Sequence, residues 1–170
     1  MLKQLPVKWE AYKQTLLDAE EMLKKAKDRF KTKLLQQSEE FKKNVNELVS
    51  EFRTKGPFSA DIKPDEALSI IEQMKAKLNK LKEEELELRK GLGIFRIDHP
   101  FSKDIQNLEK DMEALEQVWI LAKQWDDNYN GWKSTVFKTL ETRDMDDCAQ
   151  SEFKKLVKMS RDLRVNFLFH

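Results

Sequence analysis

The sequence predicts an all-α fold, an elongated antiparallel bundle of three to four helices with spectrin-like or coiled-coil-like packing. The composition supports this, because 37% of the 170 residues are charged and 39% hydrophobic, with four Gly and four Pro; such a balance is typical of long, exposed helices. Apolar residues also recur at steps of three and four, the period of a helix packed along one face. We expect residues 1–170 to form a single helical bundle that is a fragment of a larger chain.

The first helix is predicted over residues 8–55, where one apolar stripe continues almost without a break. Gln37 interrupts it near the middle. Steps of three and four place the stripe in a coiled-coil-like seam, and a helix of about 70 Å needs a partner helix along its length. The stripe consists of Trp9, Tyr12, Leu16, Ala19, Leu23, Ala26, Phe30, Leu34, Phe41, Val45, Leu48 and Phe52.

The second helix is predicted over residues 64–90. Gly56 and Pro57 end the first helix, and Pro64 starts the next with acidic residues in its first turn. Gly91 and Gly93 are expected to end the second helix, ahead of a short irregular link over residues 94–100. The predicted stripe is Ala67, Ile71, Met74, Leu78, Leu81 and Leu88, with the polar Glu85 between the last two. We expect the link to plug one end of the bundle with Ile94, Phe95 and Ile97.

The third helix is predicted over residues 102–140 and the fourth over residues 144–167. Ser102 is a good N-cap, and the apolar phase of the third helix continues through Gly131. The short link after Leu140 predicts antiparallel packing of the two helices. The third stripe is Ile105, Leu108, Met112, Leu115, Trp119, Ala122, Trp125, Tyr129, Trp132, Val136 and Leu140, and the fourth is Cys148, Phe153, Leu156, Met159 and Leu163.

The charge pattern excludes several classes of partner. The net charge is +1, from 32 basic and 31 acidic residues, so we expect no nucleic-acid binding. No uninterrupted apolar run approaches about 18 residues, so we expect no membrane span.

Cys148 is the only cysteine. It permits no internal disulfide, fits a reducing compartment such as the cytoplasm, and is expected to be a buried thiol.

One motif resembles a calcium-binding EF-hand loop and fails at its closing position. Asp126, Asn128, Asn130 and Gly131 match loop positions 1, 3, 5 and 6, but position 12, which needs a bidentate Glu, is Phe137. Such a site would hold one carboxylate and no closing ligand. We therefore expect these residues to form a polar helix face and not a metal site.

Catalytic and nucleotide chemistry have no support in the sequence. Gly91-Leu92-Gly93 lacks the Lys and the helix N-terminus of a phosphate-binding loop, and His99 and His170 do not form a zinc-ligand pair. No serine or cysteine has the context of an activated nucleophile. We predict no catalytic, cofactor-binding or metal site, no small-molecule ligand, and no enzyme activity in this segment.

Two basic stretches could meet an acidic partner or a lipid head group, or could simply be solvated helix faces. The first comprises Lys24, Lys25, Lys27, Arg29, Lys31 and Lys33; the second comprises Lys154, Lys155, Lys158, Arg161 and Arg164. The acidic residues Glu83, Glu84, Glu85 and Glu87 could neutralise one of them across the bundle. These stretches leave open a BAR-like membrane-binding module or a standalone helical adaptor as alternative functions.

The aromatic residues Trp119, Trp125, Tyr129 and Trp132 recur near one helical stripe and are expected in the core. Any of them left exposed would mark an interface with a neighbouring segment or subunit.

The chain resembles the dynein heavy chain tail, or stem, just before the linker domain. The link Gly93–Pro100 leads into Leu108-Glu109-Lys110, Leu115-Glu116 and Trp119, followed by Trp125, Trp132-Lys133 and Phe137. This order is similar to the family's Gly-x-x-x-Phe-like link, its Leu-Glu-Lys-x-x-x-x-Leu-Glu-x-x-Trp run and its spaced pair of Trp. The resemblance covers most of the chain, is most specific from Gly93 to Phe137, and is closer to an axonemal than to a cytoplasmic heavy chain.

The resemblance implies a segment of a microtubule-based, ATP-driven motor whose ATPase ring and microtubule-binding stalk lie elsewhere. It implies a structural role as a semi-rigid helical lever or scaffold. The implied partners are neighbouring heavy-chain segments, dynein intermediate or light chains, or another heavy chain, and the implied location is the axoneme of a cilium or flagellum. No catalytic residue is carried over.

Overall fold

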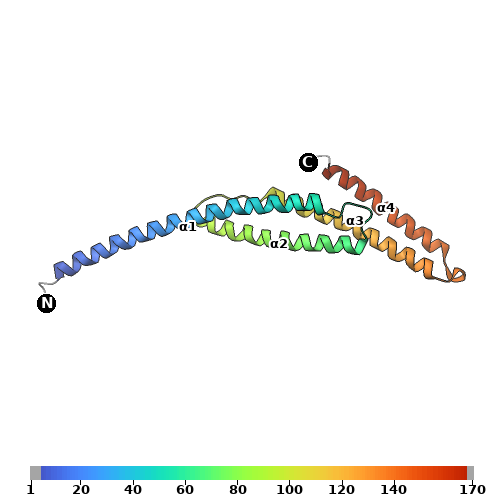
Figure 1. Ribbon diagram of the computed structural model, residues 1–170, viewed down its shortest axis with the longest axis horizontal. Helices are drawn as coiled ribbons and strands as arrows, with labels where there is room; N and C mark the ends of the chain where they lie inside the picture. Colours follow the sequence, from blue (N-terminus) through green and yellow to red (C-terminus); the bar gives the residue numbers. More distant parts are fainter. Residues whose placement is uncertain (1–4, 168–170) are drawn as a thin grey trace. The chain divides into compact units, whose positions relative to one another are not determined.

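The computed structural model describes residues 5–167, and within these residues it is built from helices without a β-strand (Figure 1). The four α-helices are α1 (Leu5–Lys55), α2 (Pro64–Ile94), α3 (Lys103–Ser134) and α4 (Thr142–Phe167), and a 3₁₀ turn, η2 (Phe137–Thr139), lies between the last two. The prediction of an all-α helical bundle is confirmed.

The end of α3 differs from the prediction, because the helix stops at Ser134 and not at Leu140. The hydroxyls of Ser134 and Thr135 both donate to the carbonyl oxygen of Gly131, at 2.9 and 2.8 Å, and Thr135 is extended (φ −80°, ψ 142°). Hydroxyl side chains that bond to a preceding carbonyl compete with helix propagation. The predicted continuity through Gly131 itself is confirmed.

The packing of the chain falls into two units, which are described separately. The first unit contains α1 up to Asn44 together with residues 83–101, and the second contains residues 45–82 and the chain from Ser102 onward. Helices α1 and α2 therefore each contribute one part to each unit. The expectation that residues 1–170 form a single bundle stays a prediction.

The core of the second unit is made by α1, α2 and α3, and predicted stripe residues from all three helices are buried in it. Ala67 and Ile71 of α2 form a cluster with Trp119 of α3, and Leu115 and Ala122 pack against it. Burying a large apolar side chain contributes about 1.5–3 kcal/mol, so this core is the main source of stability for the unit. Its buried members are Val45, Leu48, Phe52, Ala67, Ile71, Met74, Leu78, Ile105, Leu108, Met112, Trp119 and Leu121.

The loop between α1 and α2 is fastened to α3 by Trp119. The indole N–H of this residue donates to the carbonyl oxygen of Pro57 at 2.9 Å, in a buried position. Gly56 precedes the bonded residue, and a Cβ there would collide with the carbonyl oxygen of Phe52 and with the ring of Phe58. That ring packs edge-on against Phe52, with centroids 5.3 Å apart. Gly56 is thus required by close packing.

In the first unit, α2 packs against α1 through a position where glycine gives close approach. A Cβ on Gly91 would lie 2.8 Å from a side-chain carbon of Leu34, so the leucine occupies the space that a larger residue would fill. Around this contact Ser38, Phe41, Glu85, Leu88 and Leu92 are buried. The prediction that Gly91 and Gly93 end the helix is wrong, because α2 continues through both to Ile94.

The end of α2 is a left-handed cap centred on Arg96. The amide of Arg96 donates to the carbonyl of Gly93 at 3.0 Å, and the amide of Ile97 donates to the carbonyl of Leu92 at 3.1 Å. These two bonds and a φ of 56° at Arg96 define a Schellman motif. The predicted plug is only partly correct, since Phe95 and Ile97 are half-buried while Ile94 is 80% exposed.

Replacing Arg96 by Gly is expected to stabilise the chain. A side chain in the left-handed region costs about 1–2 kcal/mol, which Gly avoids, so Arg96→Gly should raise the free energy of unfolding by about 0.5–1 kcal/mol in urea denaturation. Arg96→Ala is the control, because it removes the guanidinium but keeps the Cβ. An equal gain from both variants would show that the side chain, and not the backbone conformation, determines the effect.

Replacing Trp119 is expected to destabilise the second unit in two separable steps. Trp119→Phe leaves the buried Pro57 carbonyl without its donor and should lower the free energy of unfolding by about 1–2 kcal/mol. Trp119→Ala also leaves a cavity and should cost about 3–5 kcal/mol. Trp125→Ala, at a residue that is 40% exposed, should cost less. Equal midpoints for all three variants in urea would contradict the assignment of Trp119 to the core.

Candidate interaction surfaces

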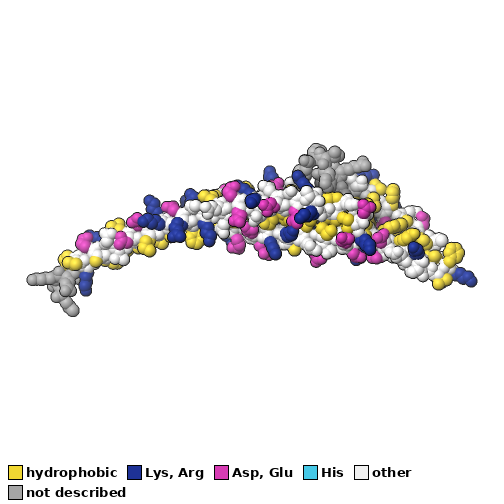
Figure 2. Space-filling model, viewed as in Figure 1, with side chains coloured by type: hydrophobic (Ala, Val, Ile, Leu, Met, Phe, Trp, Pro, Cys, Tyr) yellow, Lys and Arg dark blue, Asp and Glu magenta, His cyan; other side chains and the backbone are white. Residues whose placement is uncertain are grey.

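The first half of α1 presents an apolar stripe to solvent. Every described side chain from Pro6 to Lys33 is exposed, and Figure 2 shows hydrophobic, basic and acidic side chains interspersed at the surface along this part of the helix. Among the described residues, no helix therefore covers the first half of the predicted stripe. The exposed members include Trp9, Tyr12, Leu16, Leu23 and Phe30, with exposed fractions between 46% and 66%.

The second half of α1 continues the stripe as a buried one, with a shift in spacing between the halves. Ser38, at 6% exposure, occupies the inward position, while Gln37 is exposed. The stripe from Trp9 to Phe30 follows steps of three and four, and the stripe from Ser38 to Phe52 does so again. Between Phe30 and Leu34, and between Leu34 and Ser38, the step is four each time, which breaks the heptad repeat locally.

The first basic stretch lies on exposed helix surface, as do Lys154, Lys155, Lys158 and Arg161 of the second, while the side chain of Arg164 lies outside the described residues. In α1, Lys25 pairs with Glu21 at 2.7 Å; in α4, Lys155 pairs with Glu152 at 2.9 Å. The acidic run on α2 is divided, because Glu85 is buried while Glu87 pairs with Lys90 of its own helix at 2.7 Å. Exposed ion pairs within one helix each contribute little, so these stretches remain largely available for a partner.

The aromatic residues of α3 are only partly in the core. Trp119 is buried, but Trp125 and Tyr129 are 40% and 53% exposed, so their prediction as core residues is wrong. Trp125 packs edge-on against Trp132, with centroids 5.9 Å apart. The C-terminal turns of α3 therefore keep an exposed aromatic surface at Trp125 and Tyr129.

The face that α4 turns inward differs from the predicted one. Phe153 and Leu156 are 68% and 56% exposed, whereas Glu152 lies inward with one carboxylate oxygen buried and without a partner among the described residues. Cys148 is half-buried and not fully buried, and its sulfur accepts a hydrogen bond from the Asn128 amide at 3.3 Å. Met159 is half-buried, and the side chain of Leu163 lies outside the described residues.

Among the described residues, α2 and α3 are joined by at least three interhelical ion pairs. Lys75 contacts Glu116 at 2.6 Å, Lys82 contacts Glu109 at 2.7 Å, and Asp65 pairs with Lys123. The residue numbers of the paired positions increase along α2 and decrease along α3, so the two helices are antiparallel. The step of seven residues from Lys75 to Lys82 and from Glu109 to Glu116 is the repeat of charges flanking a coiled-coil seam. The carboxylate of Asp65, accepting a hydrogen bond from Lys123, raises the pKa of that lysine.

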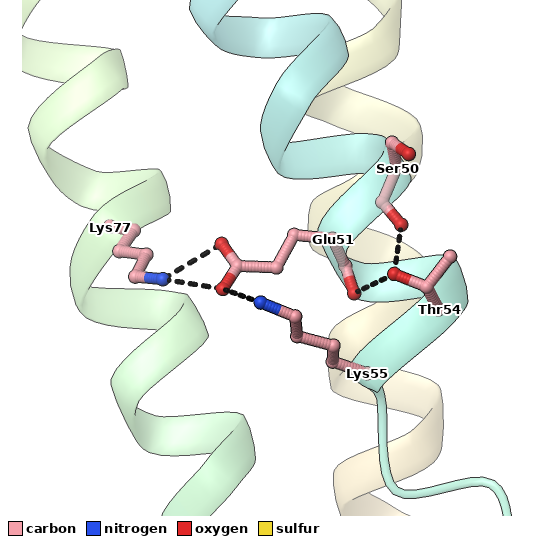
Figure 3. A network of polar contacts seen from close by, with 5 residues as sticks. All are labelled: Ser50, Glu51, Thr54, Lys55 and Lys77. Atoms are coloured by element: carbon pink, nitrogen blue, oxygen red, sulfur yellow. Dashed lines mark hydrogen bonds and ion pairs between the residues drawn. The ribbon is translucent and has the colours of Figure 1, made fainter.

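A fourth interhelical contact joins α1 to α2 at Glu51. Figure 3 shows its carboxylate between Lys77 of α2 and Lys55 of its own helix. The Lys77 ammonium reaches both oxygens, at 2.9 and 2.7 Å, and Lys55 lies at 3.8 Å. The hydrogen bond from Lys77 holds the pKa of Glu51 below its ordinary value of 4.5. The nearby hydroxyl of Thr54 donates to the backbone carbonyl of Ser50 at 2.8 Å and not to the Glu51 carboxylate.

The residues considered for metal or catalytic chemistry are placed apart or in helix. Asp126 to Gly131 lie within α3, a conformation in which the side chains cannot converge as in an EF-hand loop. Among the described residues, no group of three or more His, Cys, Asp or Glu is arranged to hold a metal ion. His99 lies in the link after α2, edge-on to Phe41 with centroids 6.3 Å apart. His170 is outside the described residues.

None of the described helices contains an apolar window long enough and poor enough in charge to cross a membrane.

Sequence reasoning missed two kinds of contact that position these surfaces: a hydrogen bond from α3 to the loop before α2, and ion pairs between α2 and α3. The bond from Trp119 to Pro57 could not be foreseen, because it joins an indole to a backbone carbonyl 62 residues away. The ion pairs between α2 and α3 did leave a signal: Lys75, Lys82, Glu109 and Glu116 each adjoin or flank a stripe position of their helix. Matching opposite charges at equal spacing on two helices would have found them.

Acid is expected to weaken the contact between Glu51 and Lys77. Since the folded chain lowers the pKa of Glu51, the carboxylate stabilises the fold above pH 4.5, and this contribution is lost as the pH falls through the lowered pKa. An NMR titration should find the Glu51 pKa below 4.5 in the parent chain and closer to 4.5 in Lys77→Met. Lys80→Met, at an exposed lysine on the same helix, should leave the value unchanged; a shift there would contradict the pairing.

Comparison with known proteins points to one family. The family model described as dynein axonemal heavy chain 2/5/8 coiled-coil matches residues 1–38, which include most of the exposed half of α1. Dynein axonemal heavy chain 2 from Mus musculus and from Homo sapiens are each 42% identical to this chain over 164 residues, or 96% of it. The Dynein-1-beta heavy chain of the flagellar inner arm I1 complex of Chlamydomonas reinhardtii is 29% identical over 164 residues. No solved structure matches the chain significantly.

The aligned residues make up about 4% of the length of each of these relatives. The chain therefore spans a small part of proteins of this kind. Because nearly all of it aligns with axonemal heavy chains, and its first helix carries the coiled-coil pattern of that family, these residues belong to the dynein heavy chain family and form a segment of its N-terminal tail.

Proposed function

We propose that this segment is a non-catalytic, semi-rigid helical lever or scaffold in the tail of an axonemal dynein heavy chain, near the linker. The motor's ATP hydrolysis takes place in other parts of the heavy chain. The observation that carries the proposal is the antiparallel joining of α2 and α3 by three ion pairs flanking a buried seam.

Such a joint suits force transmission because it resists two kinds of deformation. Helix backbones resist stretching along their axes through their hydrogen bonds, and the interdigitated seam resists sliding of one helix past another. The ion pairs fix the register, since a shift by one turn would separate every pair at once. The hydrogen bond between Trp119 and Pro57 adds a fixed point at the turn between α1 and α2.

The relatives suggest where this lever works. Two are named as axonemal heavy chains and one as part of a flagellar inner arm complex, so we place the segment in a ciliary or flagellar axoneme. The exposed apolar and basic surfaces of α1 and the aromatic surface of α3 are its contact faces. Neighbouring heavy-chain segments, intermediate or light chains, or another heavy chain are the partners we assign to those faces.

Reversing charges in the α2–α3 joint of a complete heavy chain tests the proposal. Lys75→Glu with Lys82→Glu would place like charges opposite Glu116 and Glu109. We expect a lower stall force in single-motor trapping and an unchanged rate of ATP hydrolysis without load, because the joint acts mechanically. Adding Glu109→Lys and Glu116→Lys restores attraction with the signs exchanged and should restore the stall force.

A matched variant controls for the change in net charge. Lys80→Glu with Lys110→Glu alters two exposed lysines on the same two helices and should leave the stall force as in the parent. Loss of ATP hydrolysis in the Lys75 and Lys82 double variant would contradict a non-catalytic role. A stall force unaffected by that variant would contradict the lever.

A further inference from the structure

The strongest unexplained feature is the exposed stripe of α1 between Trp9 and Phe30. In the heptad repeat that its spacing defines, Trp9, Leu16, Leu23 and Phe30 occupy the first core position, and Tyr12, Ala19 and Ala26 occupy the second. An alternation of large residues with alanines suits a partner helix whose bulky side chains fill the space beside the alanines. An open hollow lined by Ala26, Phe30 and Lys33, among others, lies at the end of this stripe.

The charges around the stripe indicate the chemistry of that partner. The positions flanking the seam carry Lys8, Lys13, Lys27 and Arg29, and only one acid, Glu20. The other acids of this stretch, Glu10, Asp18, Glu21 and Asp28, lie on the opposite face of the helix, mixed with Lys24, Lys25 and Lys31. The edges of the seam are thus basic, while the outer face is nearly neutral. Flanking charges of this kind select a partner of opposite sign.

Pairing with a second copy is disfavoured by the same charges. In a parallel pair, Lys8 of one copy would face Lys13 of the other. In an antiparallel pair centred on the alanines, Lys13 would face Lys27 of the other copy, and Glu20 would face Glu20. Like charges across a coiled-coil seam are repulsive in both arrangements.

The continuation of the stripe indicates where the partner helix comes from. From Ser38 to Phe52 the stripe is already buried. Helix α2 of the same chain approaches Leu34, just before this stretch, through Gly91, and contacts Glu51, within it, through Lys77. The homologous segment is about 4% of a heavy chain, so other helices of the same polypeptide are held near it. A covalent tether supplies a high effective concentration that a separate protein lacks.

We propose that residues 8–33 of α1 form a coiled coil with one amphipathic helix from elsewhere in the same heavy chain, whose seam is edged by Asp and Glu. This inference rests on membership of the dynein heavy chain family and not on the lever function. The basic residues Lys8, Lys13, Lys27 and Arg29 pair with the acidic edges of that helix. The outer face, with Glu21 and Lys25 paired to each other, remains in solvent.

Site-specific photo-crosslinking in a complete heavy chain tests this inference. Benzoylphenylalanine in place of Leu16 or Leu23 should crosslink to a single peptide of the same polypeptide, outside residues 1–170, with a heptad apolar stripe and acidic flanking residues. The label in place of Leu17 or Glu21, on the outer face, is the matched control and should not capture that peptide. Peptide mass spectrometry identifies the product.

Charge reversal then tests the selection by sign. Lys13→Glu with Lys27→Glu should lower the crosslinking yield from Leu23 about fivefold, because two attractive contacts become repulsive. Lys24→Glu with Lys25→Glu, on the outer face, should leave the yield unchanged. A crosslink to residues 8–33 of a second copy, to a different protein or to a basic-edged helix would overturn the inference, as would equal labelling from Leu16 and Leu17.

Discussion

The second unit of this chain depends on the burial of Trp119. Its ring closes the cluster with Ala67 and Ile71, and its N–H bonds to the carbonyl of Pro57. One side chain therefore joins α2, α3 and the turn that follows α1. A buried carbonyl without a donor costs free energy, so the indole N–H stabilises this path of the turn. Gly56 then permits the backbone to approach the ring of Phe58 in the same turn.

Polar contacts around this core determine register more than stability. Partly exposed ion pairs such as Lys75 with Glu116 contribute modestly to the free energy of folding. Their value lies in the alternatives that they exclude: a slip of α3 along α2 would separate opposite charges and leave Asp65, Glu109 and Glu116 without their lysines. The apolar seam alone tolerates such a slip better, because the burial of apolar surface is not directional.

The two halves of α1 show what the spacing of apolar residues can predict and what it cannot. The exposed residues Leu16 and Leu23 and the buried residues Val45 and Leu48 follow the same three-four spacing. Spacing identifies the face of a helix that packs, but it carries no information on whether a partner lies within the same 170 residues. The same limit applies to α4, where Phe153 is a large hydrophobic residue on the predicted inner stripe but its side chain is exposed. An amphipathic helix thus predicts that one of its faces packs against a partner, but it does not identify the partner.

The sequence alone determined the all-α class, the approximate extents of the helices, the N-cap at Ser102, the start of α2 at Pro64, and the membership of Ile71, Met112 and Trp119 in the core. These features depend on local hydrogen bonding and on helical period, which a sequence contains directly. Only the tertiary structure decided the end of α3 at Ser134, the continuation of α2 past Gly91, the bond from Trp119 to Pro57, and the exposure of Trp125 and of the first half of α1. Those depend on which surfaces meet across dozens of residues, and packing of that kind is a property of the folded chain as a whole.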